Sequence, residues 1–447
     1  MNKNWSKTTL GKIISEGNGK FQTGPFGSQL HASDYVKDGI PCIMPANMKN
    51  NRVDIDNIAR ISEKDAKRLS KHIVKKGDIL YSRRGDITLK ALITDKEVGY
   101  FCGTGCLLIR AGDKIDPEFL TYLLSTETNK VWIVKQAVGA TMPNLNTDIL
   151  SRFPLYIPSF KTQQSIAAVL SALDKKIALN KQINARLEEM AKTLYDYWFV
   201  QFDFPDANGK PYKSSGGDMV FDETLKREIP KEWEVKQISH WIKADKSGDW
   251  GKEQQEGNYT VKVNCVRGAD INAINLQGNI ETPIRFILAK NEHKLLSPFD
   301  FVVEISGGSP TQSTGRLAPI SQYVLDRFDL PLICSNFCKA ISLKDTSYFY
   351  QFAFMWSDIY KNNILFGWEG KTSGIKNLLF DNFVNGYFEC FPPKEIAEQF
   401  FKIIDKNHQE QQLLLKQNHQ LTQLRDFLLP MLMNGQVSVT CSGARDG

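Results

Sequence analysis

The stretch IAAVLSALDKKIALNKQINARLEEMAKTLYDYW, residues 166–198, decides the fold, because its apolar residues recur at alternating steps of three and four. This spacing is typical of a helix that packs along a long partner helix. The stretch FFKIIDKNHQEQQLLLKQNHQLTQLRDFLLPML, residues 400–432, has the same spacing. We therefore expect the two stretches to pair as a coiled coil. The expected seam consists of Ile166, Leu170, Leu173, Ile177, Asn180, Asn184, Leu187 and Leu194 in the first copy and Phe400, Ile404, Leu414, Asn418, Leu421 and Leu428 in the second.

Sequence before each helix repeats at a similar distance. Cys102-Gly-Thr-Gly-Cys106 matches Cys334-Ser-Asn-Phe-Cys338, and Gly139-Ala-Thr141 matches Gly370-Lys-Thr372. A repeat of about 230 residues is far longer than the unit of a solenoid protein. The sequence therefore predicts two homologous halves, each a globular domain followed by a long helix.

Short apolar runs separated by glycine and asparagine turns fill the first globular domain. Ile40–Met44, Asp78–Tyr81 and Gly105–Arg110 are typical of strands, and a helix is expected from Pro117. The predicted fold class is α/β of the mixed α+β kind. The predicted segments are a first domain at 1–158, a helix at 159–200, a linker at 201–229, a second domain at 230–392, a helix at 393–435 and a flexible tail at 436–447.

Composition indicates an intracellular protein and says little about chemistry. The chain has 447 residues, a formal net charge of +6 and eight cysteines, which we expect to be reduced. It contains no apolar run long enough to span a membrane and no secretory signal, so the expected location is the cytoplasm. The mild positive charge permits a polyanionic partner without requiring one.

Four motifs resemble one protein family. They are Thr23-Gly-Pro-Phe-Gly-Ser28, Lys76-Gly-Asp-Ile-Leu-Tyr-Ser-Arg83, Gly139-Ala-Thr-Met-Pro-Asn-Leu-Asn146 and Ile229-Pro-Lys-Glu-Trp-Glu-Val235. With them, nearly the whole chain resembles the specificity subunits of type I restriction-modification systems. The resemblance implies two target-recognition domains whose helices pair antiparallel as a spacer. It also implies a cytoplasmic DNA reader for bacterial defence that is not itself catalytic.

The same resemblance implies partners. These are double-stranded DNA with a bipartite target, two methyltransferase (modification) subunits, and restriction subunits that act as motor and nuclease. The complete assembly of such systems is a site-specific deoxyribonuclease and an adenine methyltransferase. If the helices pair antiparallel at matching centres, Asn180 and Asn418 should lie in one layer, where their amides can bond to each other.

A protein that reads duplex DNA needs cations for phosphates and planar polar groups for base edges. Arginine favours guanine, and asparagine or glutamine favours adenine. The predicted contacts in the first domain are Gln22, Ser28, Gln29, Arg83, Arg84, Thr141, Asn144 and Asn146. Those in the second are Arg267, Gln312, Ser313, Arg316, Lys371, Thr372, Ser373, Lys376 and Asn377. Alternatively, any of these residues is an ordinary solvated loop residue.

Motifs for catalysis are incomplete. Gly370-Lys371-Thr372 resembles the end of a phosphate-binding loop, but Leu365 stands where that loop needs glycine. The cysteine pairs have no nearby histidine to complete a zinc site. We therefore expect no catalytic residue, metal or cofactor on this chain. Two alternatives stay open: a coiled-coil scaffold that binds protein partners, and a self-contained DNA methyltransferase, which the missing cofactor motif disfavours.

Overall fold

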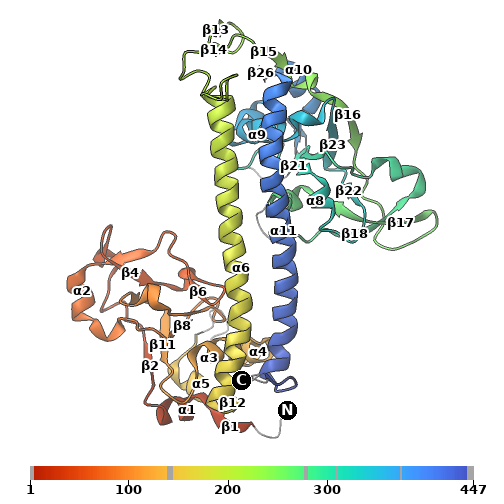
Figure 1. Cartoon of the computed structure of the whole chain (residues 1–447). Coiled ribbons are helices and arrows are strands. Elements are labelled where there is room, and N and C mark those ends of the chain that lie inside the picture. Colours follow the sequence, from red (N-terminus) through yellow and green to blue (C-terminus); the bar gives the residue numbers. More distant parts are fainter. Residues whose placement is uncertain (1–4, 138–143, 276–279, 308–310, 373–374, 440–447) are drawn as a thin grey trace, which may run out of the picture. The chain divides into compact units, whose positions relative to one another are not determined.

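The structure is a computed structural model that describes residues 5–137, 144–275, 280–307, 311–372 and 375–439. It divides into two compact units, residues 1–177 with 420–447 and residues 178–419. Each unit contains a mixed α/β domain and part of both long helices (Figure 1).

The first unit is built on a four-stranded antiparallel sheet with the order β2-β11-β8-β9. Its strands are β2 (Lys20–Thr23), β11 (Cys106–Arg110), β8 (Asp78–Ser82) and β9 (Lys90–Leu92). A second sheet, ordered β10-β4-β7-β3, contains β10 (Phe101–Cys102), β4 (Ile40–Ile43), β7 (Ala59–Ile61) and β3 (Tyr35–Val36). Two short pairs are β1 (Ser6–Thr9) with β12 (Pro154–Ile157) and β5 (Met48–Lys49) with β6 (Arg52–Val53). The short helices are α1 (Leu10–Glu16), α2 (Glu63–Arg68), α3 (Pro117–Leu123), α4 (Glu127–Gln136) and α5 (Thr147–Ser151).

Strand β8 is the centre of this domain because every one of its residues is buried. Ile79 and Tyr81 pack into one hydrophobic core, and Leu80 packs into a second core on the opposite face. Successive strand side chains point to opposite faces, so a strand covered on both sides reads as a continuous apolar run. At its first residue, Asp78 accepts two hydrogen bonds from Arg110, at 2.7 and 2.6 Å.

The second unit repeats this plan. Its four-stranded antiparallel sheet, ordered β16-β23-β19-β21, contains β16 (Ile242–Ser247), β23 (Cys338–Leu343), β19 (Asp300–Glu304) and β21 (Leu317–Ile320). Two three-stranded sheets are β18 (Ile284–Leu288), β17 (Tyr259–Val266) and β22 (Leu332–Cys334), and β20 (Ser306–Gly307), β25 (Ile375–Leu378) and β24 (Glu369–Thr372). Two-stranded pairs are β15 (Glu234–Gln237) with β26 (Phe388–Phe391) and β13 (Met219–Asp222) with β14 (Arg227–Pro230). The short helices are α7 (Ile271–Ile274), α8 (Gln322–Leu325), α9 (Phe349–Lys361) and α10 (Phe380–Gly386).

Strand β19 corresponds to β8. All of its residues are buried, with Phe301 and Val303 in one core and Val302 in another. Its first residue, Asp300, accepts a hydrogen bond from the Lys246 ammonium at 2.9 Å. The duplication predicted from sequence is therefore visible in the sheet order and in the buried acid that starts each central strand.

The two long helices are α6 (Phe160–Tyr195) and α11 (Lys394–Met433), with 36 and 40 residues. Each has residues in both units. In the second unit, the Asn180 amide donates to the Asn418 Oδ1 at 2.9 Å, and both residues are buried. Asn184 lies later in α6 and contacts Gln411, which lies earlier in α11. The helices are therefore antiparallel, and the predicted asparagine layer is confirmed.

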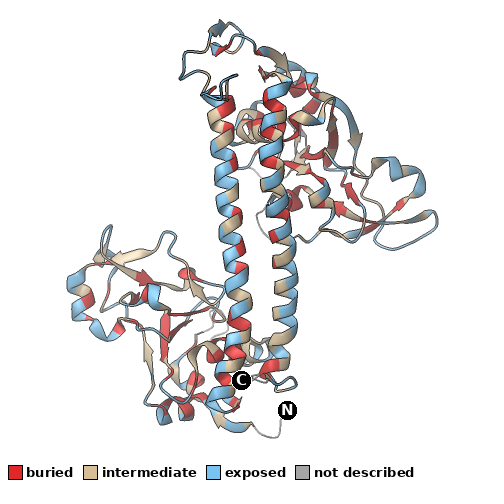
Figure 2. Cartoon of the chain, viewed as in Figure 1, coloured by how far each residue is buried: buried red, intermediate tan, exposed pale blue. Residues whose placement is uncertain are grey.

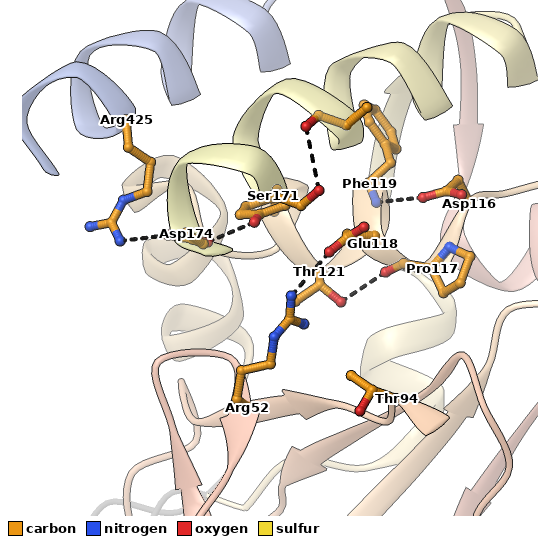
Figure 3. Close-up of polar contacts among 12 residues, drawn as sticks. Arg52, Thr94, Asp116, Pro117, Glu118, Phe119, Thr121, Ser171, Asp174 and Arg425 are labelled. Carbon is orange, nitrogen blue, oxygen red and sulfur yellow. Dashed lines mark hydrogen bonds and ion pairs between the residues drawn. The ribbon is translucent and has the colours of Figure 1, made fainter. Parts of the chain in front are cut away.

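Buried residues recur along each long helix (Figure 2). Every predicted seam position is buried or partly buried. In the first unit, Asp174 of α6 accepts hydrogen bonds from Arg425 of α11 at 3.0 Å and from Tyr122 of α3 at 2.6 Å. Figure 3 shows Asp174 facing Arg425 beside the helix that carries Glu118 and Thr121. One carboxylate thus ties the first domain to both long helices.

The segment 201–229, predicted from its polar composition as a linker, has defined structure. Phe202 and Phe204 are buried against Trp233, with ring centroids 5.2 and 5.3 Å apart. Asp203 accepts hydrogen bonds from the backbone and hydroxyl of Ser214. The polar turn residues hide these contacts in the sequence, because Trp233, the ring against which both phenylalanines pack, lies beyond the segment.

We expect the asparagine layer to set the register of the helix pair at a cost in stability. Asn418→Ala removes one partner and leaves the Asn180 amide buried, so the free energy of unfolding should fall by about 1–3 kcal/mol. Replacing both residues by leucine should restore much of that loss, because no unpaired amide remains. Chemical denaturation measures both effects.

Gln420→Ala provides the control, since Gln420 is exposed on the same helix. It should change the free energy of unfolding by no more than about 0.5 kcal/mol. An equal loss in Asn418→Ala and Gln420→Ala would contradict a structural role for the layer.

Candidate nucleic-acid interface

In the first domain, predicted DNA contacts gather where β8 ends. Arg83 and Arg84 follow Ser82 directly, and the Arg83 backbone is held on two sides. Its N–H donates to the Gly105 carbonyl at 2.8 Å, and its carbonyl accepts from the Leu145 N–H at 2.9 Å. Arg84 forms a β-bridge with Asn144. Backbone pairing thus brings two segments about 60 residues apart in sequence to one edge of the sheet.

Side chains complete a cluster that we name the first arginine patch: Phe26, Gln29, Arg83, Arg84 and Asn144. The Arg83 Nε donates to the Asn144 Oδ1 at 3.3 Å, and the Arg83 guanidinium carbon lies 5.6 Å from the centroid of the Phe26 ring. Gln29 accepts a hydrogen bond from the Phe26 N–H at 3.2 Å. Arg83 is therefore held in place, whereas Arg84 is exposed.

A hollow of about 620 Å³ adjoins the first arginine patch. Arg84 lies on its wall together with Tyr35, Met44 and Thr104. Met44 and Tyr35 give the hollow an apolar side, and Arg84 adds a cation with several N–H donors. Such a wall can accommodate both the apolar and the hydrogen-bonding parts of a base edge.

Other predicted contacts of the first domain have different roles. The Gln22 amide donates to the Lys71 carbonyl at 2.8 Å and lies 3.0 Å from the His72 Nδ1. Burial lowers the pKa of His72 to about 4, so its ring is neutral near pH 7 and can accept that bond. Asn146 caps α5 by accepting from the Ile149 N–H at 2.8 Å. Ser28 is exposed, and Thr141 lies outside the described residues.

In the second domain, the sheet β20-β25-β24 begins just after β19 and occupies the corresponding place. The Ser306 hydroxyl donates to the Asn377 Oδ1 at 2.5 Å. The Lys376 ammonium lies 3.2 Å from the Glu369 carboxylate and 4.6 Å from the centroid of the Phe366 ring. Burial alone would raise the pKa of Glu369, but hydrogen bonds from Thr314 and Lys376 lower it.

Two further predictions for the second domain meet partners inside the protein. Arg316 donates two hydrogen bonds to Glu304, at 2.8 and 2.7 Å, because the buried carboxylate that ends β19 requires a cation. Ser313 is buried and donates to the Thr314 carbonyl at 2.8 Å. Sequence alone could not show these partners, since Glu304 and Arg316 meet only through the pairing of β19 with β21.

The remaining predicted residues are placed as follows. Arg267 donates to Asp270 at 2.9 and 2.8 Å, so its charge is largely neutralised. The Gln312 carbonyl accepts from Lys376 at 3.4 Å. Lys371 and Thr372 lie on β24 with side chains outside the described part, and Ser373 is not described.

Two residues of these surfaces were missed by sequence reasoning. Phe26 and Phe366 each lie beneath a predicted cation, Arg83 and Lys376 respectively. Phe26 stands inside the glycine-proline turn of residues 23–28, and an aromatic residue within such a turn is the sequence signal that could have drawn attention to it. Phe366 carries no comparable local sequence pattern.

Within the described ranges, no group of three or more histidine, cysteine, aspartate or glutamate side chains could hold a metal ion. The described helices include none with the length and apolarity needed to cross a membrane. The described cysteines are buried and unpaired by disulfides.

Comparison with known proteins finds similarity to one family. Residues 2–189 match the family model for the type I restriction modification DNA specificity domain. The specificity subunit of the type I restriction enzyme MjaIX, from Methanocaldococcus jannaschii, is 27% identical over 418 residues, which is 91% of this chain and 88% of that protein. The chain is therefore similar to a type I specificity subunit over most of its length, and residues 2–189 match the domain of that family.

Two further relatives agree with this family. The HindI specificity subunit of Haemophilus influenzae is 37% identical over 161 residues, 35% of this chain and 34% of that protein. The crystal structure of the type I restriction-modification S subunit from M. genitalium matches with a TM-score of 0.60 and 17% identity, covering 96% of both chains. That match shows a common fold.

Arg316 should matter for stability more than for DNA contact. Arg316→Ala leaves the buried Glu304 carboxylate without its cation, so the free energy of unfolding should fall by about 3–5 kcal/mol. Arg84→Ala changes an exposed residue and should cost no more than about 0.5 kcal/mol. Thermal or chemical denaturation distinguishes the two; an unchanged stability for Arg316→Ala would contradict a structural ion pair.

Proposed function

We propose that this chain is a non-catalytic type I specificity subunit that reads a bipartite DNA target, with one half-site read by each domain. The observation that carries the proposal is the equivalent position of two polar surfaces. Each begins where a fully buried central strand ends, at Ser82 in β8 and at Glu304 in β19. Two homologous scaffolds that present different side chains at the same place suit the recognition of two different short sequences.

The first arginine patch suits a guanine-containing half-site. Arginine pairs in a bidentate manner with the O6 and N7 acceptors of guanine in the major groove. Asn144 and Phe26 hold Arg83 in position, which lowers the entropy lost on binding. Arg84 is exposed beside it and can reach either a base or a phosphate.

The second surface has a different chemistry. Asn377 and Lys376 lie on β25, and Lys371 and Thr372 lie on the neighbouring β24. Asparagine suits adenine, and lysine serves phosphates as a point charge. We therefore propose that the second half-site differs in sequence from the first.

We further propose that two methyltransferase subunits, and restriction subunits with motor activity, assemble on this chain. Apolar side chains exposed on the long helices support this assignment. Met190 of α6 and Leu413 of α11 are 61% and 59% exposed. Large apolar side chains in water commonly mark surfaces that a partner covers.

Substitutions in the two surfaces should affect different half-sites. Arg83→Ala should relax or weaken recognition of one half-site and Lys371→Ala that of the other. The expected cost is about 1–3 kcal/mol for a bidentate base contact and less for a phosphate contact. Competition binding with duplexes altered in one half-site at a time measures both, on the complex with the methyltransferase. Lys12→Ala, at an exposed position of α1, is the control. Loss at the same half-site in both variants would refute separate readers.

Expression with the partner methyltransferase in a host free of adenine methylation provides the direct test. Methylome sequencing should find one motif of two short specific parts with a fixed gap between them. A continuous motif would contradict the bipartite proposal.

Salt dependence separates this proposal from a protein scaffold. DNA affinity of the assembled complex should fall linearly with salt on logarithmic axes, because contacts to phosphates release counterions. Arg84→Ala should reduce that slope by about one if Arg84 binds a phosphate. The absence of salt-sensitive DNA binding would favour the scaffold alternative.

A further inference from the structure

A second hollow lies in the unit formed by residues 178–419. Its volume is about 170 Å³. Its walls come from the end of α6, from α9 and from β26. For comparison, an apolar protein cavity of about 150 Å³ is large enough to hold benzene. The hollow therefore has room for a small organic molecule.

One face of helix α9 forms one wall of the hollow. Gln351, Met355, Asp358, Ile359 and Asn362 all line the hollow, and their spacing of three, four and seven residues places them on one side of a helix. Asn362 is exposed and Gln351 is 2% exposed. The wall thus runs from solvent at Asn362 to the protein interior at Gln351.

The deepest polar atom on this wall lacks a partner. Gln351 Oε1 accepts no hydrogen bond within the described part of the chain. Its amide nitrogen makes only a 3.9 Å contact to the Met355 Sδ. A buried acceptor without a donor costs about 1–3 kcal/mol, so a donor placed in the hollow would be stabilised there.

Asp358 provides a second acceptor. It forms no ion pair with any described residue, although it is partly buried. Burial, and then the Asp196 carboxylate, raise the pKa of Asp358, while Lys361 and Lys192 oppose the rise. A cation in the hollow would favour the charged carboxylate.

The other charged groups on the walls already face each other. The Arg227 guanidinium lies 3.7 Å from the Glu389 carboxylate. Burial raises the pKa of Glu389, and the Arg227 charge opposes that rise. Arg227 also lies over the Phe202 ring, 5.4 Å from its centroid. Asp358 is therefore the acid of the hollow whose charge is least compensated.

Aromatic residues form the opposite side. Tyr195 and Phe199 stack with centroids 5.3 Å apart, and Trp233 lies 5.9 Å from Phe199. Here α6 continues as a π-helical turn, Asp196–Val200, which widens the helix where the hollow begins. Aromatic faces attract cations and also cover methylene groups. Val200, at the end of this turn, is exposed and lines the hollow.

We propose that this hollow binds a small primary alkylammonium compound. Its N–H donors would meet Asp358 and Gln351 Oε1, and its methylene groups would lie against Phe199 and Trp233. An anion would face two acceptors and an uncompensated carboxylate, so it is disfavoured. A neutral hydrocarbon would leave both acceptors unpaired.

Isothermal titration of the full chain with n-butylammonium and putrescine tests the proposal, with 1-butanol as the neutral control. Both amines should bind and 1-butanol should not. Asp358→Asn should weaken amine binding at least about tenfold, because it removes the charge while keeping the shape. Glu395→Gln makes the same charge change at an exposed position of α11 and should leave binding unchanged. No binding by either amine, or equal binding by 1-butanol, would overturn the proposal.

A second variant tests the same site independently, in case Asp358→Asn fails to fold. Val200→Trp adds bulk at the exposed edge of the hollow and should abolish amine binding without lowering the melting temperature. Undiminished binding in that variant would place the amine elsewhere and overturn the site.

Titration with Nα-acetyllysinamide distinguishes a lysine side chain from a free amine as the source of the ammonium group, since the free amines should bind at least as tightly. Neither variant changes the proposed DNA-reading surfaces, so DNA affinity reports on that function independently.

Discussion

Each domain depends on one strand that is covered on both faces. Every residue of strands β8 and β19 is buried, and their alternate side chains enter two separate cores. A polar group can be accommodated in such a strand only if it is paired. Asp78 and Asp300 begin the strands, and each is held by a cation. The two strands therefore fix the position of the residues that come directly after them.

The side chains that follow each central strand can differ between the two domains without any change in the buried strands. After β8 come Arg83 and Arg84, which are supported by Asn144 from a distant segment. After β19 the chain forms a short strand that pairs with β25, while Glu304 takes Arg316 as an internal partner. The same framework thus presents arginines in one half and an asparagine-lysine sheet in the other. The proposed reading of two half-sites requires this combination of a constant core and a variable edge.

The long helices follow a different principle. Their seam is only partly apolar, and the buried amides of Asn180, Asn184 and Asn418 weaken it relative to leucine. A buried polar layer restricts the alternatives, because most shifts in register leave an amide without a partner. Asp174 adds a link from the helices to the first domain through Tyr122 and Arg425. The pair therefore trades some stability for a defined register.

The sequence by itself determined the duplication, the mixed α/β class, the helix pair and the asparagine layer. These features follow from local periodicity and from spacing along the chain, which need no knowledge of tertiary contacts. Only the tertiary structure decided which polar residues stand at the surface. Arg83 and Arg316 look alike in sequence, yet one lies above Phe26 and the other is bound to Glu304. The partners of such residues come from strands distant in sequence, and burial of a carboxylate is a property of the packed sheet rather than of any short motif.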